Sequence, residues 1–223
     1  MRIPQLTVAA AAALLLTACG GGGPLDGATG PEVADAAAGA LAEAGSFRVS
    51  GEMTSNGEEG EVDLHVQGDD LTGTITTAGV ELQLLSVGGS VYMQAPPEFW
   101  APFGMPEDMA GTFEDQWVVV PGEAMAEFDE FSLDGFVDQL RNPESEVQEE
   151  VTEDELDGED VVVVEQADGS RLFVANDDPA YPLQMTNDGD SAGTITFSRF
   201  GEEEEISAPA DAIDLMAMMG GAA

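Results

Sequence analysis

Apolar and polar residues alternate along much of this sequence after Ser46, and this period of two constrains the fold more than any other feature. In the segment 62–67, for example, aliphatic residues alternate with Asp63, His65 and Gln67. The same alternation recurs, with Gly, Asn and Asp residues between the segments, at 47–53, 71–77, 80–84 and 91–93. The pattern predicts consecutive antiparallel strands with one apolar face and one face in water, and it places His65 on the polar face.

The second half of the sequence repeats the alternation and adds helical segments. Further strands are predicted at 117–120, 147–151, 161–165, 171–175, 183–186 and 194–200. Thr29 and Gly45 bound one helix, and Ser132 caps a second helix. A short terminal helix is expected to contain Ile213, Leu215, Met216 and Met219. About ten strands with a few short helices predict the α+β class.

The charge balance excludes several partners and several kinds of chemistry. The chain has 45 acidic residues against five arginines, and its formal net charge is −40. Such a surface is repelled by nucleic-acid phosphates, so we expect no nucleic-acid partner. His65 is the only histidine, and the sequence contains no nucleophile elbow, phosphate-binding loop or paired metal-ligand motif. The sequence therefore predicts no enzyme, no metal site and no cofactor.

The N-terminus has the features of a bacterial lipoprotein signal. Residues 7–16 are apolar or small throughout, and this run has about half the length that a membrane-spanning helix needs. The sequence Leu-Thr-Ala-Cys at 16–19 follows and matches a lipobox. The match implies cleavage after Ala18 and diacylation of Cys19, the only cysteine in the chain. The alternative is an ordinary secretory signal with an incidental cysteine.

This signal sets the expected organisation of the chain. We expect a signal peptide at 1–18, a lipidated cysteine with a Gly-rich flexible tether at 19–30, and one domain at 31–223. Two or three acyl chains anchor a protein stably. The domain is therefore expected on the extracytoplasmic side of the cell membrane, held there by its lipid anchor.

Residues 95–116 interrupt the alternation. This segment contains four prolines, and the candidates for a lid are its large apolar residues Phe99, Trp100, Phe103, Met105 and Met109. The prolines exclude long regular structure. Two interpretations stay open: a lid over an apolar binding space, or a cap packed over the end of the sheet.

The order of segments resembles that of one group of envelope proteins, the actinobacterial LprG/LppX-type lipoproteins, which are similar in turn to the lipoprotein carrier LolA. The resemblance covers residues 31–215 and rests on AGSFRVSG at a helix end, SVGGSVYMQAPPEFW, VANDDPAYPLQM and the closing ITFSRFGEEEEISAPADAIDL. It implies a half-barrel, a curved antiparallel β-sheet wrapped on a few short helices, with a hydrophobic cavity for the acyl chains of a lipid or glycolipid. This sequence departs from the group in its acidity and its lack of lysine.

The resemblance implies a monomeric lipoprotein that binds and carries or presents a lipid without catalysis, with a membrane transporter as a candidate partner. Candidates for the cavity wall are apolar residues of the strands and the second helix: Val49, Leu64, Leu82, Leu84, Val91, Phe136 and Leu140. Arg171 and Arg199 are in phase with apolar neighbours, so each is a candidate headgroup contact or the partner of a nearby carboxylate. The alternative function is a filled-core acidic lipoprotein that acts as an interaction or structural module of the envelope.

Overall fold

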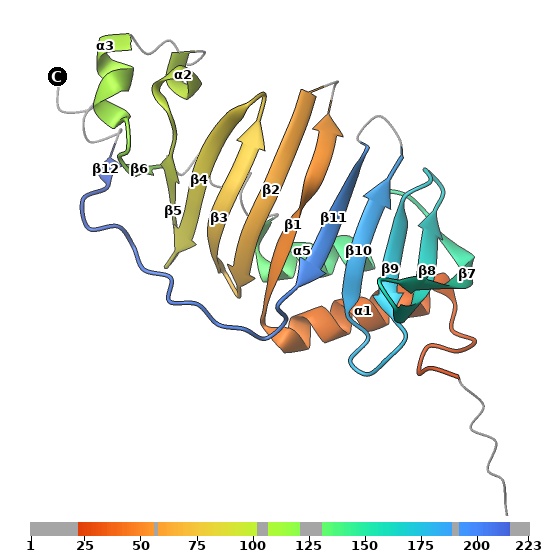
Figure 1. Cartoon of the computed structure of the whole chain (residues 1–223). Helices are drawn as coiled ribbons and strands as arrows, with labels where there is room; N and C mark the ends of the chain where they lie inside the picture. Colours follow the sequence, from red (N-terminus) through yellow and green to blue (C-terminus); the bar gives the residue numbers. More distant parts are fainter. Residues whose placement is uncertain (1–21, 56–57, 102–106, 121–130, 189–191, 215–223) are drawn as a thin grey trace, which may run out of the picture.

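The structure, a computed structural model, describes residues 22–55, 58–101, 107–120, 131–188 and 192–214 of the 223-residue chain. Within these residues twelve strands form one open sheet in the order β12-β6-β5-β4-β3-β2-β1-β11-β10-β9-β8-β7 (Figure 1). Helices cover one face of this sheet, which curves around them. The α+β class and the curved antiparallel sheet predicted from the sequence are confirmed.

The first half of the sheet is a meander in which each strand pairs with the next one along the chain. Its strands are β1 (Ser46–Ser55), β2 (Glu58–Gln67), β3 (Asp70–Thr77), β4 (Val80–Val87), β5 (Ser90–Gln94) and β6 (Val118–Val119). The register places alternate residues on one face, so that Val49 lies opposite Leu64, and Leu64 opposite Gly73. This inner face is the one that the alternation predicted as apolar.

The second half is another antiparallel meander, and it returns to the middle of the sheet. Its strands are β7 (Val147–Leu156), β8 (Glu159–Gln166), β9 (Arg171–Ala175), β10 (Pro182–Asn187) and β11 (Gly193–Ser198). Strand β11 pairs with β1, with Phe197 opposite Val49. Strands distant in sequence therefore share one inner face at the β1–β11 junction.

A C-terminal segment, residues 199–212, leaves β11 in the middle of the sheet and runs to the edge beside β6 (Figure 1). It is tied to the sheet where Gly201 N donates to Ser46 O at 2.8 Å and Glu204 N donates to the Gln67 side chain at 3.0 Å. It ends in β12 (Ile213–Asp214), which pairs in parallel with β6. The prediction of a terminal helix is wrong at Ile213, because its N–H donates to Trp117 O as part of a strand pair. The rest of the predicted helix, residues 215–219, lies outside the described residues.

Two helices cover the middle and one end of the inner face: α1 (Gly30–Ala44) and α5 (Leu133–Arg141). The carboxylate of Glu32 accepts hydrogen bonds from the backbone N–H and the hydroxyl of Thr29, which fixes the start of α1. The backbone hydrogen bond from Thr29 is the main reason that the pKa of Glu32 is lowered. Gly45 ends α1, as predicted, and the structure shows it in the left-handed conformation (φ 71°).

The core divides into two clusters on the inner face. The main cluster packs α1 and α5 onto strands from both halves, and Phe47 and Leu41 are fully buried in it. The second cluster lies under α2 (Pro97–Trp100), α3 (Glu107–Ala110) and the 3-10 turn η2 (Gly111–Phe113), beside β4 and β6. In the described residues no helix is both long enough and apolar enough to cross a membrane.

The domain begins earlier in the chain than we expected. Leu25 has only 7% of its surface exposed and belongs to the main cluster, and its backbone N–H donates to the Asn176 side chain at 3.1 Å. The expected boundary at residue 31 is therefore corrected, because a single leucine after the glycines has a site in the core. The Gly-rich composition did not show this.

His65 lies on the outer face opposite Arg48, as predicted, but the expectation that it is solvated is wrong. The residue is 5% exposed, and neither ring nitrogen has a hydrogen-bond partner within the described protein. Arg199 and Glu204 of the C-terminal segment line the same small hollow as His65. The alternation shows which face a residue is on but not what covers that face.

Replacing Ser132 with alanine is expected to lower the free energy of unfolding by about 1 kcal/mol, because the Ser132 hydroxyl caps α5 by accepting a hydrogen bond from Gly135 N at 3.1 Å. Urea unfolding measures the change. A Ser132→Asp variant keeps an acceptor at this position and serves as the control. Equal loss in both variants would contradict a capping role.

Candidate functional site

An apolar cleft of about 420 Å³ lies on the inner face between α5 and the strands of the β1–β11 junction. Its lining comes from β1, β2, β10, β11, α5 and the segments beside them: Val49, Met53, Thr54, Val62, Phe131, Phe136, Gln139, Ser170, Met185, Thr186, Asn187, Gly193, Ile195 and Phe197. Its volume falls within the range of protein sites for small molecules, about 300–1,000 Å³.

The walls of the cleft combine rigid rings with flexible side chains. Phe136 and Phe197 meet edge to face at 6.1 Å between ring centroids, and both contact Phe47 beneath them. Met53 stands at the rim and is 41% exposed, which makes it the one large hydrophobic side chain exposed among the described residues. Methionine adapts to irregular apolar shapes, so these walls can accommodate a flexible hydrocarbon chain.

A polar hollow of about 760 Å³ adjoins the cleft and shares Gln139, Ser170, Met185 and Asn187 with it. The rest of its lining comes from α5, the loop after α5 and the turn before β9: Ser132, Asp134, Gly135, Asp138, Asn142, Pro143, Glu144, Ser145, Gln166 and Asp168. Asp134, Asp138 and Glu144 are exposed, so the hollow opens to solvent. A ligand in the cleft can therefore extend into a polar region.

The carboxylate of Asp168 in the hollow is fixed by its own turn. Ser170 N donates to it at 3.0 Å, and this backbone hydrogen bond is the main reason that the pKa of Asp168 is lowered. The Asp168 N–H in turn donates to the Ser145 hydroxyl at 3.1 Å. The lowered pKa further favours the ionised form of this side chain, which adds a negative charge to the hollow.

The structure divides the predicted cavity residues between the cleft and the core. Val49 and Phe136 line the cleft. Leu64, Leu84 and Leu140 are buried in the main cluster, Leu82 is in the second cluster, and Val91 is buried on the same inner face near the second cluster. Six apolar lining residues were not among the predicted cavity residues: Met53, Val62, Phe131, Met185, Ile195 and Phe197. The period-two alternation marks Ile195 and Met185 as facing the inner side, so that signal was available.

The described part of the segment 95–116 packs against β4 and β6 through the second cluster. Trp100 is buried, with its ring 5.1 Å from that of Phe99 and 5.9 Å from that of Phe113. None of these rings lines the cleft. The other lid candidates, Phe103, Met105 and the side chain of Met109, lie outside the described residues. The predicted lipidation site, Cys19, also lies outside them.

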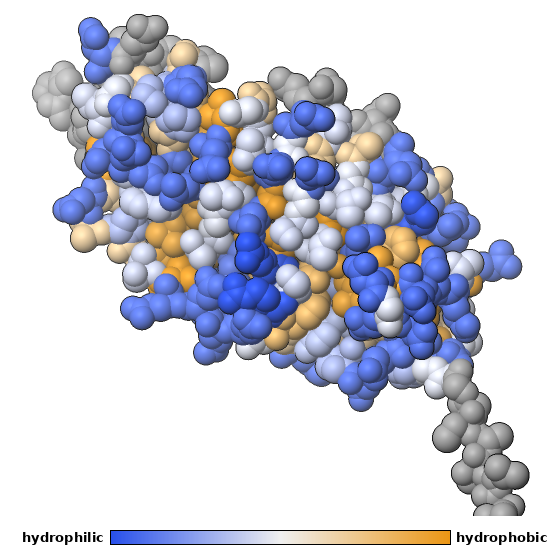
Figure 2. Space-filling view, in the orientation of Figure 1, coloured by the Kyte–Doolittle hydropathy of each residue, from blue (hydrophilic) through white to orange (hydrophobic). Residues whose placement is uncertain are grey.

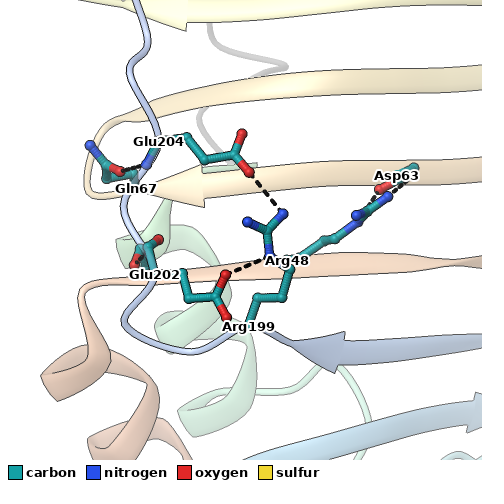
Figure 3. Close-up of polar contacts among 7 residues, drawn as sticks. Arg48, Asp63, Gln67, Arg199, Glu202 and Glu204 are labelled. Atoms are coloured by element: carbon teal, nitrogen blue, oxygen red, sulfur yellow. Dashed lines mark hydrogen bonds and ion pairs between the residues drawn. The ribbon is translucent and has the colours of Figure 1, made fainter.

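Arg199 lies on the outer face, and the prediction that it shares the apolar side of its strand is wrong. Its φ of 54° is left-handed, which breaks the alternation just after β11. Figure 3 shows its guanidinium between the carboxylates of Glu202 and Glu204, each at 2.8 Å. The hydrogen bonds that Arg199 donates, first to Glu202 and then to Glu204, raise its pKa.

Arg171 also lies on the outer face. It pairs with Asp188 at 3.3 Å, and its guanidinium lies 5.9 Å from the centre of the Phe173 ring. Beside Arg199, Arg48 forms a two-nitrogen ion pair with Asp63 (Figure 3). Figure 2 views this outer face, where hydrophilic residues surround smaller apolar patches. Neither Arg171 nor Arg199 is among the residues that line the cleft or the polar hollow.

Comparisons with known proteins identify the fold. No protein-family model matches the chain, and no curated protein sequence does. Among solved structures, LprF from Mycobacterium bovis aligns with a TM-score of 0.53 at 16% identity, over 81% of this chain and 97% of that one. The lipoprotein LppX from Mycobacterium tuberculosis aligns with a TM-score of 0.52 at 14% identity, over 80% and 98%. The resemblance drawn from the sequence is thus confirmed for the fold.

Proposed function

We propose that this chain is a lipid-anchored envelope lipoprotein that binds the acyl chains of a lipid in the apolar cleft and carries or presents that lipid without catalysis. The observation that carries the proposal is the cleft itself, an apolar space of about 420 Å³ between α5 and the sheet.

The energetics of acyl transfer support an apolar cleft as the binding site. Each CH₂ group removed from a membrane and exposed to water costs about 0.8 kcal/mol, so a sixteen-carbon chain needs about 12 kcal/mol of compensation. A protein can take up such a chain only if its own apolar surface replaces the contacts that the chain made in the membrane. In the cleft, Val62, Phe136 and Ile195 offer the acyl chain such a surface.

The N-terminal sequence supports a membrane anchor close to the domain. The lipobox ends at Cys19, and Leu25 is already part of the core. Six residues of fully extended chain span at most about 20 Å. An acylated Cys19 would therefore hold the domain within one small-protein diameter of the lipid surface, which suits extraction or presentation of a membrane lipid.

Lipid analysis of the purified protein tests the proposal. The mature chain from residue 19, with Cys19→Ser to prevent acylation, is secreted from a lipid-rich actinobacterial host, extracted with organic solvent and examined by mass spectrometry. We expect a near-stoichiometric acyl lipid. A folded protein that carries no lipid, and that takes up no fluorescent fatty-acyl probe, would contradict the proposal and favour the filled-core interaction module.

A further inference from the structure

We infer that the cleft selects lipids whose headgroup carries hydrogen-bond donors and no net negative charge, and that it discriminates against anionic phospholipids. The inference rests on the proposed function and concerns the same site. A lipid with its chains in the cleft places its headgroup where the cleft becomes polar, and the polar hollow adjoins the cleft through four shared residues.

The chemistry of the polar hollow is that of an acceptor-rich, cation-free surface. Its lining includes the carboxylates of Asp134, Asp138, Glu144 and Asp168, with amide and hydroxyl groups between them. Ionised carboxylates only accept hydrogen bonds, so a headgroup must supply O–H or N–H donors. A phosphate would bring a negative charge among these acids without an arginine or lysine to pair with it.

The arginines of the domain are all engaged elsewhere. Arg171 follows Ser170, which lines the hollow, but its own side chain is on the outer face with Asp188. Arg141 ends α5 and pairs with Asp35 of α1 at 3.1 Å. Arg48 and Arg199 are ion-paired on the outer face. Among the residues that the structure describes, no basic side chain therefore lines the cleft or the polar hollow.

The other hollow that shares residues with the cleft has the same character. It adjoins the cleft at Met53, Thr54 and Gly193, and its polar rim includes Glu52, Glu59 and Glu61 without any basic residue. A headgroup at this rim would meet carboxylates as well. The charge selection therefore holds for either direction in which a lipid enters the cleft.

Displacement of a cleft-bound fluorescent fatty-acyl probe tests this selection on the non-acylated mature chain. Three dioleoyl lipids with identical chains compete with the probe: phosphatidylglycerol, a galactosyl diacylglycerol and a lipid with a primary ammonium headgroup. Cyclodextrin delivers them singly, because an anionic vesicle would be repelled by the net charge of −40 whatever the cleft prefers. The galactosyl lipid offers O–H donors without charge, and the ammonium lipid offers N–H donors with a positive charge. Comparing the two shows which kind of donor the polar hollow prefers.

At low salt we expect the galactosyl lipid, the ammonium lipid or both to compete at least about tenfold better than phosphatidylglycerol. High salt should reduce this difference in competition between phosphatidylglycerol and the other lipids, since screening weakens charge repulsion. An Asp138→Asn/Glu144→Gln variant should also reduce the difference. The control Glu149→Gln/Glu150→Gln removes the same charge from exposed positions on β7 and should leave the difference in competition unchanged.

Equal competition by all three lipids at low salt would overturn the inference while leaving the proposed function intact, and so would an equal effect of the two double variants. A chain that binds neither the probe nor any lipid would overturn the proposed function, and the inference with it.

Discussion

Replacing Ile195 with tryptophan is expected to weaken lipid binding about fiftyfold while the domain stays folded. Ile195 lies on the inner face of β11 and lines the cleft, and its neighbours across the strand pairs are Gly51 and Met185. Because Gly51 has no side chain, the indole can extend into the cleft without displacing a core residue. Excluding three methylene groups of a ligand would remove about 2.4 kcal/mol, or about fiftyfold in affinity.

The matched control for this variant is Thr196→Trp, one residue along the same strand. Thr196 is exposed on the outer face, opposite Ser50 and Gln184. Mass spectrometry of extracted lipid and probe titration compare both variants with the parent chain, and far-UV circular dichroism checks that they are folded. Equal lipid content in all three proteins would contradict the cleft as the binding site.

Replacing Gly73 with alanine is expected to lower the free energy of unfolding by about 2–5 kcal/mol, the combined cost of a strained backbone and of overpacking. Gly73 lies in β3 opposite Leu64 and has a φ of 151°, a conformation that residues with a side chain rarely adopt. An added Cβ would collide with the carbonyl oxygen of Asp63 and approach the Leu64 Cα atom to 2.8 Å. Both are backbone atoms of β2 and cannot move aside alone.

The control for this prediction is Gly39→Ala in the middle of α1, where a Cβ meets no atom within 4 Å. Alanine is the better helix former, so this variant should gain about 0.5–1 kcal/mol. Urea unfolding of both variants gives the two changes with opposite signs. A loss below about 1 kcal/mol for Gly73→Ala would show that β2 and β3 can separate to admit a side chain, contrary to the close strand approach that the structure shows.

Local patterns predicted the elements well. The capping pattern around Thr29 and the left-handed end at Gly45 located α1, and Ser132 located the start of α5. These features depend on residues a few positions apart, whose interactions do not change with the rest of the fold. The alternation likewise assigned Val49, Leu64 and Ile195 to one face of the sheet.

The candidate site was predicted only in part, because facing inward does not decide between core and cleft. Leu64 and Val49 face the same way and are both buried in the main cluster, yet only Val49 also borders the cleft. That distinction depends on where α5 lies across the sheet. Arg199 was assigned to the wrong face since one left-handed residue ends the alternation.

By itself, then, the sequence determined which elements form, which face of each strand is apolar, and that the surface is acidic. Those properties follow from the spacing of side chains and from composition. Only the tertiary structure decided that β11 joins β1, that Arg199 and Glu204 lie in the same hollow as His65, and that a cleft remains beside α5. These depend on contacts between segments about 60 to 150 residues apart, which the whole packing selects and no local pattern records.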